Sequence, residues 1–453
     1  MPDSDRYVST TPRANLDALL GLIKSATASA VAEYENTGYG VPSLDSQIPH
    51  PGDSISASIA LRKAIRTLEA ACHQLCATLT PPTLSMASRG MTLRELSVMK
   101  IAIEARVSDI LREHPRGLHV TKISERTSIE SGKLARVLRL LAVKHVYREV
   151  APDVFANNRL SLLLASSHPT SSLLGHWLNE GYAAEGNLYQ TLVDSDLGPS
   201  YAPLKSAFAT AVTDQQMTMF EWFVNHPRES ERFGKAMIGY GYVSDSAAAV
   251  DNYPWGDLPK GTSVCDVGGG IGSVLILLAR KQPHLRLTLQ DLPNVVEQAQ
   301  GFWRDGCPEA IQERRIQFTP LNFFEQSPEK NQDVYYLKQV FHDWPDEQCR
   351  MIIRNIRKVM KPGSRLLIHD YVLRKACRGN NGTMTDSAAP LPLLPTWGAG
   401  NSRPYAQDIN MMALHNSKER TFEEFVELGN VVGLKVVKLW DFVETGMVEF
   451  ILE

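Results

Sequence analysis

The sequence lacks the features that mark a secreted, membrane-spanning or zinc-binding protein. Its six cysteines, in a chain of 453 residues, form no C-x-x-C pair, and no two histidines have the spacing of metal ligands. This pattern predicts neither a disulfide framework nor a metal site. The first residues, Met1 to Arg6, contain no apolar signal core, and no apolar run approaches the length of a membrane span. We therefore expect a cytoplasmic protein that does not enter a membrane.

The chain also lacks a strong charge of either sign. Its formal net charge is -3, and 43% of its residues are hydrophobic. A near-neutral balance argues against a protein dedicated to nucleic acid, which would carry an excess of Lys and Arg. A chain of this length can bury at least two sizeable cores. The composition therefore predicts a globular protein with more than one domain.

The most informative segment runs from Val264 to Gly272, Val-Cys-Asp-Val-Gly-Gly-Gly-Ile-Gly. It has the pattern of a buried strand, a glycine turn and a helix that begins at Ser273, and a second strand then ends on Asp291. Glycines let the backbone approach a ligand more closely than a Cβ would allow. An acid at the tip of the second strand can accept hydrogen bonds from both hydroxyls of a ribose. The pattern predicts a nucleotide-binding βαβ unit.

A dinucleotide-dependent dehydrogenase is the competing interpretation of this loop. Its fingerprint is G-x-G-x-x-G, whereas the turn here begins with Asp266 and has glycines at 268, 269, 270 and 272. A carboxylate at the head of the turn would repel a pyrophosphate but suits a ligand that carries a cation. S-adenosylmethionine has an ammonium, a sulfonium and no phosphate. The loop therefore favours S-adenosylmethionine as the cofactor.

A histidine follows another predicted strand. The segment from Tyr335 to Glu347, Tyr-Tyr-Leu-Lys-Gln-Val-Phe-His-Asp-Trp-Pro-Asp-Glu, places His342 beyond the carboxyl end of that strand. In open α/β sheets ligands bind at this end. A histidine is most often a surface residue or a satisfied core residue, but this position makes His342 a candidate functional residue.

Four ordered motifs resemble the class I S-adenosylmethionine-dependent O-methyltransferases, typified by plant caffeic acid and flavonoid enzymes, and especially their fungal secondary-metabolism members. The motifs are Asp266 to Gly272, Gln290 to Pro293, Leu337 to Glu347 and Lys418 to Thr421. The resemblance covers residues 95 to 453. It implies a Rossmann-like, doubly wound α/β sheet preceded by an α-helical winged-helix dimerisation domain, and hence a homodimer. The four motifs are highly specific for the family, but they say much less about which acceptor is methylated.

The resemblance implies roles for individual residues. His342 would be the general base that takes the proton from the acceptor hydroxyl, and Asp370 and Glu419 would be the carboxylates beside it. A phenol has a pKa of about 10 and an imidazole one of about 6.5, so this transfer is feasible while the methyl group moves to oxygen. Without the resemblance, Asp370 and Glu419 could equally be a solvated strand end and a helix-capping acid. Cofactor contacts would come from Asp266, Gly268, Gly270, Asp291, Leu292, Asn322, Phe323 and Lys338.

One position departs from the family pattern. The family has an acid that receives the adenine amino group, and here that position is Asn322, in Leu321-Asn-Phe-Phe-Glu325. Its carbonyl oxygen can still accept a hydrogen bond, but it lacks the charge. We expect adenine binding to persist with altered strength.

The rest of the chain indicates four parts. They are a helical N-terminal extension (1–90), a winged-helix dimerisation domain (91–165), a helical connector that lines the substrate pocket (166–250) and the S-adenosylmethionine-binding catalytic domain (251–453). Residues 13 to 80 have helical spacing on both sides of a polar loop from Tyr39 to Ser54. This extension would pack across a partner subunit or be loosely attached. The long Gly/Pro/Ser-rich stretch from Lys375 to Pro404 predicts either a lid over the acceptor site or a flexible insertion.

Five residues are candidates for the acceptor pocket. Met237 matches a family position over the acceptor ring, and the others are Trp222, Phe223, His176 and Met412. A Met and aromatic residues at helical spacing fill a core about as often as they line a pocket.

Two further function classes remain open. The helix expected from Ser131 to Leu141 and the strands expected at 146–150 and 154–156 are typical of a winged helix, so Lys133, Arg136 and Arg139 could contact DNA phosphates. Alternatively, an enzyme of the same fold could bind S-adenosylmethionine without transferring its methyl group. Lys338 and His342 would then polarise a carbonyl during a dehydration or pericyclic cyclisation. The motifs do not separate methylation from this chemistry.

Overall fold

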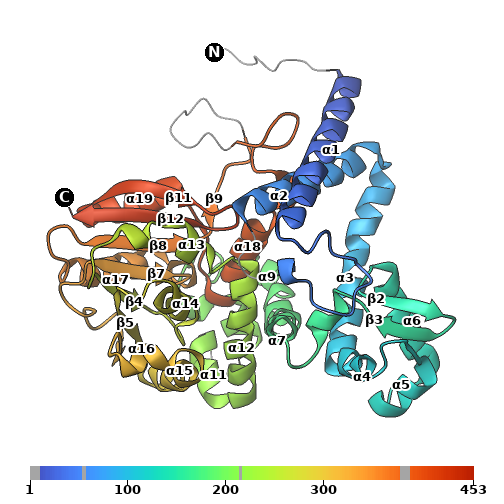
Figure 1. Cartoon of the computed structure of the whole chain (residues 1–453), viewed down its shortest axis with the longest axis horizontal. Coiled ribbons are helices and arrows are strands. Elements are labelled where there is room, and N and C mark those ends of the chain that lie inside the picture. The colour runs from blue at the N-terminus through green and yellow to red at the C-terminus, as the bar shows by residue number, and fades with distance from the viewer. Residues whose placement is uncertain (1–10, 54–57, 214–216, 378–387, 453) are drawn as a thin grey trace. The chain divides into compact units, whose positions relative to one another are not determined.

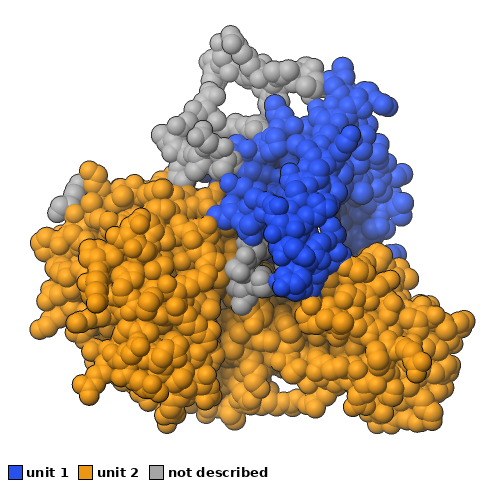
Figure 2. All heavy atoms as spheres, in the orientation of Figure 1, with its two compact units in different colours: residues 1–42, 50–93, 374–403 blue, residues 43–49, 94–373, 404–453 orange. Residues whose placement is uncertain are grey.

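The computed structural model describes residues 11–53, 58–213, 217–377 and 388–452. The segment from Met1 to Arg6 and residues 378–387 of the predicted insertion lie outside these ranges. The chain forms two compact units, which Figure 2 distinguishes by colour. The first contains residues 1–42, 50–93 and 374–403, and the second contains residues 43–49, 94–373 and 404–453.

The first unit combines N-terminal helices with part of the insertion. Its elements are α1 (Pro12–Asn36), η1 (Pro51–Asp53), α2 (Ile59–Leu79), the first half of α3 (Pro82–Glu104) and η7 (Gly398–Asn401). Helix α1 begins where the Thr11 side chain accepts a hydrogen bond from the Ala14 N–H. The helices predicted between residues 13 and 80 are thus confirmed, with the polar loop between them.

The insertion contributes to the core of this unit. Leu393 and Trp397 pack in one buried cluster with Leu19 of α1 and Ala71 of α2. The guanidinium carbon of Arg66 lies 3.7 Å from the centroid of a Trp397 ring. The described end of the insertion is therefore part of a helical core.

The second unit begins with a small helical domain. Its elements are α4 (Val107–Arg112), β1 (Leu118–His119), α5 (Val120–Thr127), α6 (Ser131–Val143), β2 (Tyr147–Ala151) and β3 (Val154–Asn157). The strands pair in the antiparallel order β1-β3-β2. This is the predicted winged-helix pattern, with β2 starting one residue later than expected. The two-residue β1 was not predicted because so short a strand has no periodicity.

A helical connector follows. Its elements are η2 (Ser161–Leu164), α7 (Pro169–His176), η3 (Trp177–Gly181), α8 (Tyr182–Glu185), α9 (Leu188–Val193), η4 (Pro203–Lys205), α10 (Ala207–Ala211), α11 (Met219–Asn225), α12 (Pro227–Val243), α13 (Ala248–Asn252) and η5 (Trp255–Asp257). Helices α7 and α12 pack along each other, and a Cβ added to Gly239 of α12 would lie 2.6 Å from the Pro169 carbonyl oxygen. The close approach therefore requires glycine at this position.

The rest of the second unit contains a seven-stranded sheet with helices on both faces (Figure 1) and a short parallel pair of strands, β9 (Val372–Leu373) and β10 (Arg420–Thr421). The strands, in the order β11-β12-β8-β7-β4-β5-β6, are Leu434–Asp441, Gly446–Leu452, Arg365–Asp370, Val334–Lys338, Ser263–Val267, Arg286–Asp291 and Ile316–Pro320. The helices are α14 (Ser273–Lys281), α15 (Pro293–Gly306), α16 (Pro308–Gln312), α17 (Asp346–Arg357), α18 (Arg403–His415) and α19 (Phe422–Val431). Strands β8, β7, β4, β5 and β6 are parallel, and β12 and β11 form an antiparallel hairpin at one edge.

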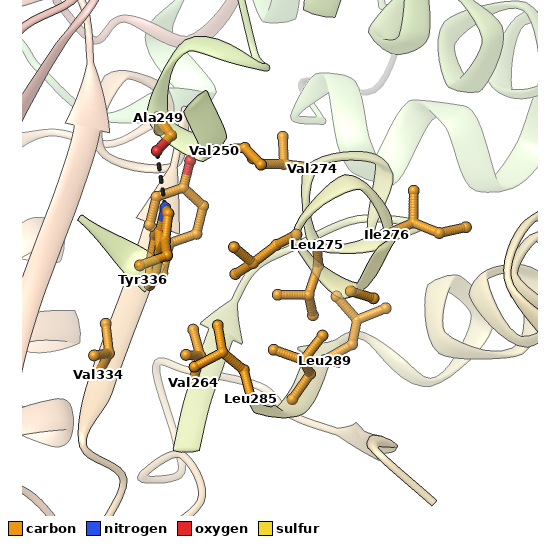
Figure 3. Packing of buried hydrophobic residues seen from close by; sticks show 14 of the residues in the cluster. Ala249, Val250, Val264, Val274, Leu275, Ile276, Leu285, Leu289, Val334 and Tyr336 are labelled. Atoms are coloured by element: carbon orange, nitrogen blue, oxygen red, sulfur yellow. Dashed lines mark hydrogen bonds between the residues drawn. The ribbon is translucent and has the colours of Figure 1, made fainter. Parts of the chain in front are cut away.

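Alternate residues of the central strands fill two cores. In β7, Val334 and Tyr336 pack with α14 and α15 in the cluster drawn in Figure 3, whereas Tyr335 and Leu337 pack with α17 and α19 on the other face. Strands buried on both faces are typical of a parallel sheet covered by helices. This is the predicted doubly wound α/β fold, and it directs the carboxyl ends of its five parallel strands to one edge.

Candidate active site

The glycine loop after β4 folds as the motif predicts. Gly268, Gly270 and Gly272 have φ of +73°, +60° and +79°, values that favour glycine. A Cβ added to Gly268 would lie 2.9 Å from Val340, whereas one added to Gly270 would meet no protein atom within 4 Å. The loop therefore needs glycine at 268 for packing, and it leaves open space beside the backbone at 270.

Asp266 lies at the end of β4 beneath this loop. It is buried, and its Oδ1 has no hydrogen-bond partner among the described residues. Burial, and then the nearby carboxylate of Asp291, raises the pKa of Asp266 to about 7, while Lys338 opposes the rise. An incompletely compensated acid at this point suits a ligand that carries positive charge.

Asp291, at the end of β5, organises the neighbouring backbone. Its Oδ2 accepts a hydrogen bond of 2.8 Å from the Gly270 N–H, and its Oδ1 accepts one of 2.7 Å from the Leu292 N–H. Burial raises the pKa of Asp291, although these two bonds lower it. Asp291 therefore holds the glycine loop against the next strand, a structural role that the sequence did not reveal.

The remaining predicted cofactor residues lie at the same sheet edge. The Oδ1 of Asn322 accepts a hydrogen bond of 3.2 Å from the Phe324 N–H, so this oxygen caps its own turn after β6. Phe323 packs edge-on against Phe324 and Trp344. Lys338 ends β7, where its ammonium donates to the Gln339 side-chain oxygen. Burial lowers the pKa of Lys338 to about 8, against the opposing effects of Asp370 and Asp266.

His342 lies on the short 3-10 turn η6 (Phe341–Asp343) that follows β7. It is 6% exposed, and its Nδ1 lies 2.8 Å from Oε1 of Glu419, whose side chain is fully buried. Burial, and then Asp408, raises the pKa of Glu419 well above its ordinary value, while Arg420 opposes this. When Glu419 is ionised it accepts from Nδ1–H, which leaves Nε2 with its lone pair. The structure thus brings together two residues that are 77 positions apart.

Asp370 ends β8 beside this pair. It is 1% exposed, and neither carboxylate oxygen has a hydrogen-bond partner among the described residues. The pKa of Asp370 is raised to about 7, chiefly by burial, with His342 opposing the rise and Glu419 adding to it. His342 is therefore surrounded by carboxyl groups that gain from a positive charge on the imidazole.

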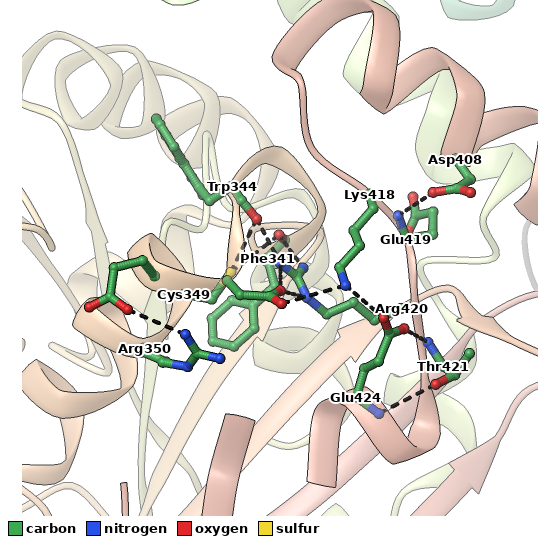
Figure 4. A network of polar contacts seen from close by, with 12 residues as sticks. Phe341, Trp344, Cys349, Arg350, Asp408, Lys418, Glu419, Arg420, Thr421 and Glu424 are labelled. Atoms are coloured by element: carbon green, nitrogen blue, oxygen red, sulfur yellow. Dashed lines mark hydrogen bonds and ion pairs between the residues drawn. The ribbon is translucent and has the colours of Figure 1, made fainter. Parts of the chain in front are cut away.

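Arg420 fixes the loop that carries His342, and Figure 4 shows its contacts. Its Nη1 donates to the Phe341 carbonyl at 2.7 Å, and its Nη2 donates to the Trp344 carbonyl at 2.7 Å and to Asp346 at 2.8 Å. The family resemblance covers the Lys418 to Thr421 motif but implies no role for Arg420. Arg420 is 1% exposed, and a buried Arg needs such acceptors. In the sequence, the only sign of this role was the acidic residue Asp346, which could pair with it.

A second histidine was also missed. The Oδ1 of Asp343 lies 3.6 Å from Nε2 of His342 and 3.7 Å from Nε2 of His415, the last residue of α18. Burial raises the pKa of Asp343 to about 7. Burial, and then His342 and His176, lowers the pKa of His415 to about 3, so this ring is neutral. No local motif predicts that His415 lies near Asp343, because α17, β8, the insertion and most of α18 separate the two residues in sequence.

The predicted acceptor residues differ in burial and lie on different helices. Trp222 and Phe223 pack in a hydrophobic cluster with Met411, which accords with the core interpretation of these aromatic residues. Met237 is 38% exposed on α12, and Met412 is half-buried on α18. His176 is buried against Glu180 and lies edge-on to Phe233.

Three other features bear on function. Among the described residues, no group of three His, Cys, Asp or Glu side chains could hold a metal ion. In that same part of the chain, none of the helices combines the length and apolar character that crossing a membrane requires. In the winged helix, Arg139 pairs with Asp153 at 2.7 Å, so one of the three cations considered for DNA binding has an intramolecular partner.

Comparison with known families places two domains on the chain. Residues 204–435 match the model of the O-methyltransferase domain, and residues 92–167 match that of the O-methyltransferase dimerisation domain. The chain is 40% identical over 446 residues to 3-O-methyltransferase 2 of Phanerochaete chrysosporium, covering 98% of this chain and 99% of the relative. It is 32% identical to O-methyltransferase gedA of Aspergillus terreus, covering 93% and 92% respectively.

Solved structures share the fold at lower identity. OxaC in complex with SAH and oxaline superposes with a TM-score of 0.68 at 20% identity, over 96% of this chain and 100% of that one. LepI in complex with SAM gives a TM-score of 0.70 at 18% identity, over 98% and 100%. A structure described as a pericyclic reaction enzyme gives a TM-score of 0.69 at 20% identity, over 86% and 94%.

Proposed function

Because the chain belongs to the O-methyltransferase family, we propose that it methylates a phenolic or enolic hydroxyl of a small secondary metabolite, such as a polyketide, an aromatic compound or a pyridone. The methyl donor is S-adenosylmethionine. The observation that carries this proposal is the buried pair of His342 and Glu419 at the same sheet edge as the glycine loop.

The residues of the loop fit S-adenosylmethionine. Space beside Gly270 admits a ligand close to the backbone, and Asp266 offers an unpaired carboxylate oxygen to positive charge. Asp291 and Leu292 would bind the ribose edge, and Asn322, Phe323 and Lys338 complete the proposed site. When bound there, the cofactor supplies an electrophilic methyl group on a sulfonium. Similar structures that contain SAM or SAH support this assignment.

His342 acts as the general base. With Nδ1 committed to Glu419, Nε2 takes the proton of the acceptor hydroxyl as the oxygen gains the methyl group. The imidazolium that forms is stabilised by Glu419, Asp370 and Asp343, because a positive charge on the ring offsets the cost of ionising these buried groups. The Arg420 contacts hold the turn, so little reorganisation is needed during proton transfer.

We propose that the acceptor lies beside His342. Met237, His176 and Met412 are the proposed acceptor contacts, together with the aromatic cluster that contains Trp222 and Phe223. We also propose a homodimer, which the match to the dimerisation domain supports. A cytoplasmic location accords with six free cysteines, because cysteines outside oxidising compartments stay reduced.

The experiment that tests this function follows product mass. Purified enzyme, S-adenosylmethionine and hydroxylated aromatic acceptors should give a product heavier by one methyl group and an equal amount of S-adenosylhomocysteine. His342→Gln should keep cofactor binding and lower kcat by roughly two to four orders of magnitude, because proton abstraction is lost.

The alternative chemistry gives a different result. An isomerised or dehydrated product with the cofactor unconsumed would identify a cyclase of the same fold. In that case His342→Gln should retain substantial activity, since an amide can still donate a hydrogen bond, and Lys338→Ala should be the more damaging change.

A further inference from the structure

A second histidine and carboxylate pair lies in the helical connector, outside the His342 site. Nδ1 of His176, the last residue of α7, lies 3.1 Å from Oε2 of Glu180. The two side chains are 3% and 6% exposed. The pairing repeats the one between His342 and Glu419, in which a buried carboxylate also approaches Nδ1. The chain thus holds two buried imidazoles in the same way.

The backbone at this pair is unusual. After His176 the chain passes through a π-helical turn, η3, before α8 begins. π turns are rare and frequently occur at functional sites, where they displace a side chain from regular helical register. A Cβ added to Gly181 at the end of this turn would lie 3.5 Å from Oδ1 of Asn410, on α18. The turn therefore contacts the helix that ends at His415.

A row of rings connects His176 with the His342 site. The His176 ring is edge-on to Phe233 at 5.2 Å, and Phe233 is edge-on to Phe220 at 6.3 Å. Phe220 stacks on His415 at 5.2 Å, and His415 approaches the carboxylate next to His342. His176 and His415 therefore border the same group of aromatic side chains, whose faces and edges suit contact with an aromatic ring, and His415 leads on to the carboxylate next to His342.

The contacts of Glu180 define which nitrogen of His176 points away from a carboxylate. Oε1 of Glu180 forms an ion pair with Arg232, so the carboxylate is already balanced. A carboxylate can only accept, so Nδ1 of His176 donates to Glu180, and a neutral ring keeps its lone pair on Nε2. Among the described residues, no hydrogen bond engages Nε2. Such a nitrogen accepts a hydrogen bond from a hydroxyl group.

We propose that His176 binds a second hydroxyl group of the acceptor, so that the acceptors of this enzyme are aromatic compounds with at least two hydroxyls. This inference rests on the proposed function for the position of the first hydroxyl at His342. Glu180 and Arg232 are positioning residues, because they act through the His176 ring. A site built to bind a hydroxyl discriminates strongly against an analogue that lacks it, since the buried nitrogen would be left unpaired.

The test measures binding separately from methyl transfer. Calorimetry with enzyme saturated with S-adenosylhomocysteine would compare naphthalene-2,7-diol with 2-naphthol, and 4,4′-dihydroxybenzophenone with 4-hydroxybenzophenone. Each pair differs by one hydroxyl. We expect at least one diol to bind roughly ten- to a hundredfold more tightly than its partner. If methyl transfer is absent while this preference holds, the proposed function fails and the His176 site stands.

Variants assign the preference to His176. His176→Phe keeps a ring against Phe233 but removes both nitrogens, and it should bind each diol no better than its partner. His176→Gln retains an acceptor oxygen and should keep part of the preference. His73→Gln, at an exposed histidine of α2, is the matched control and should keep all of it. An unchanged preference in a folded His176→Phe variant, or equal binding of both members of each pair by the native enzyme, would overturn the inference.

Discussion

Replacing Asp370 with Asn should stabilise the folded protein while it impairs catalysis. Burial moves the pKa of Asp370 from 3.8 to about 7, so the folded state binds a proton that the unfolded state releases. For a group whose folded pKa is raised, the stabilising contribution is complete below the unfolded pKa and is lost as the pH rises through the folded one. Full ionisation of this side chain therefore costs about 4 kcal/mol, at about 1.4 kcal/mol per pH unit.

The assay is urea unfolding of the cofactor-free protein at pH 5, 6, 7 and 8, at one protein concentration. The free energy of unfolding of Asp370→Asn should exceed that of the native protein by an amount that grows over this range, and the gain should level off above pH 7. Over the same range kcat should fall in the variant, because a neutral amide stabilises the imidazolium of His342 less. Glu297→Gln, at an exposed position of α15, should show a constant difference.

A parallel pair of stability curves from pH 5 to pH 8 would refute this reasoning. It would mean that Asp370 ionises at its ordinary pKa and is hydrated, despite being 1% exposed and without a hydrogen-bond partner among the described residues. If kcat fell but the free energy of unfolding showed no pH-dependent gain, Asp370 would keep its catalytic role. Its ionisation in the folded protein would then not destabilise the fold.

Three other outcomes are expected. Gly270→Val should abolish S-adenosylmethionine binding measured by calorimetry, whereas Gly363→Val, also at positive φ and in open space, should carry the same backbone strain without that loss. Asp291→Ala should weaken cofactor binding roughly 10- to 150-fold, since it removes an acceptor for ribose and the anchor of the Gly270 N–H; an unchanged Kd would place the nucleotide elsewhere. Light scattering at micromolar concentration should give a dimer, and a fully active monomer would contradict this.

Much of the fold could be predicted because local signals were strong. The glycine run after Val264, the acid at Asp291 and the apolar segment before His342 each mark a strand and its carboxyl end, and β4, β5 and β7 lie there. Parallel strands bring their ends to one edge whatever their separation in sequence. The insertion was different, because a Gly/Pro/Ser-rich composition does not reveal that Leu393 and Trp397 pack with α1 and α2.

The sequence could name candidate site residues but not the contacts between them. The resemblance named His342 and Glu419, and the structure joins them at 2.8 Å. It gave no role to Arg420, and it did not reveal that His415 approaches Asp343, because both facts depend on tertiary packing of the segment from His415 to Arg420 against the loop after β7. Asn322 illustrates the same limit, since its side-chain oxygen is used by its own turn.

The arrangement around His342 also bears on the type of reaction. Asp343, Asp370 and Glu419 all have raised pKa values, so their burial opposes folding when they are ionised. A reaction that only polarises a neutral carbonyl develops no cation on His342, so it leaves the cost of ionising these buried carboxyl groups unrelieved. A reaction that converts His342 to an imidazolium gains from each carboxylate, because the positive charge that develops lowers their pKa values and relieves the cost of their burial. The electrostatics of the site therefore favour proton abstraction from a hydroxyl over carbonyl polarisation, in agreement with methyl transfer to oxygen.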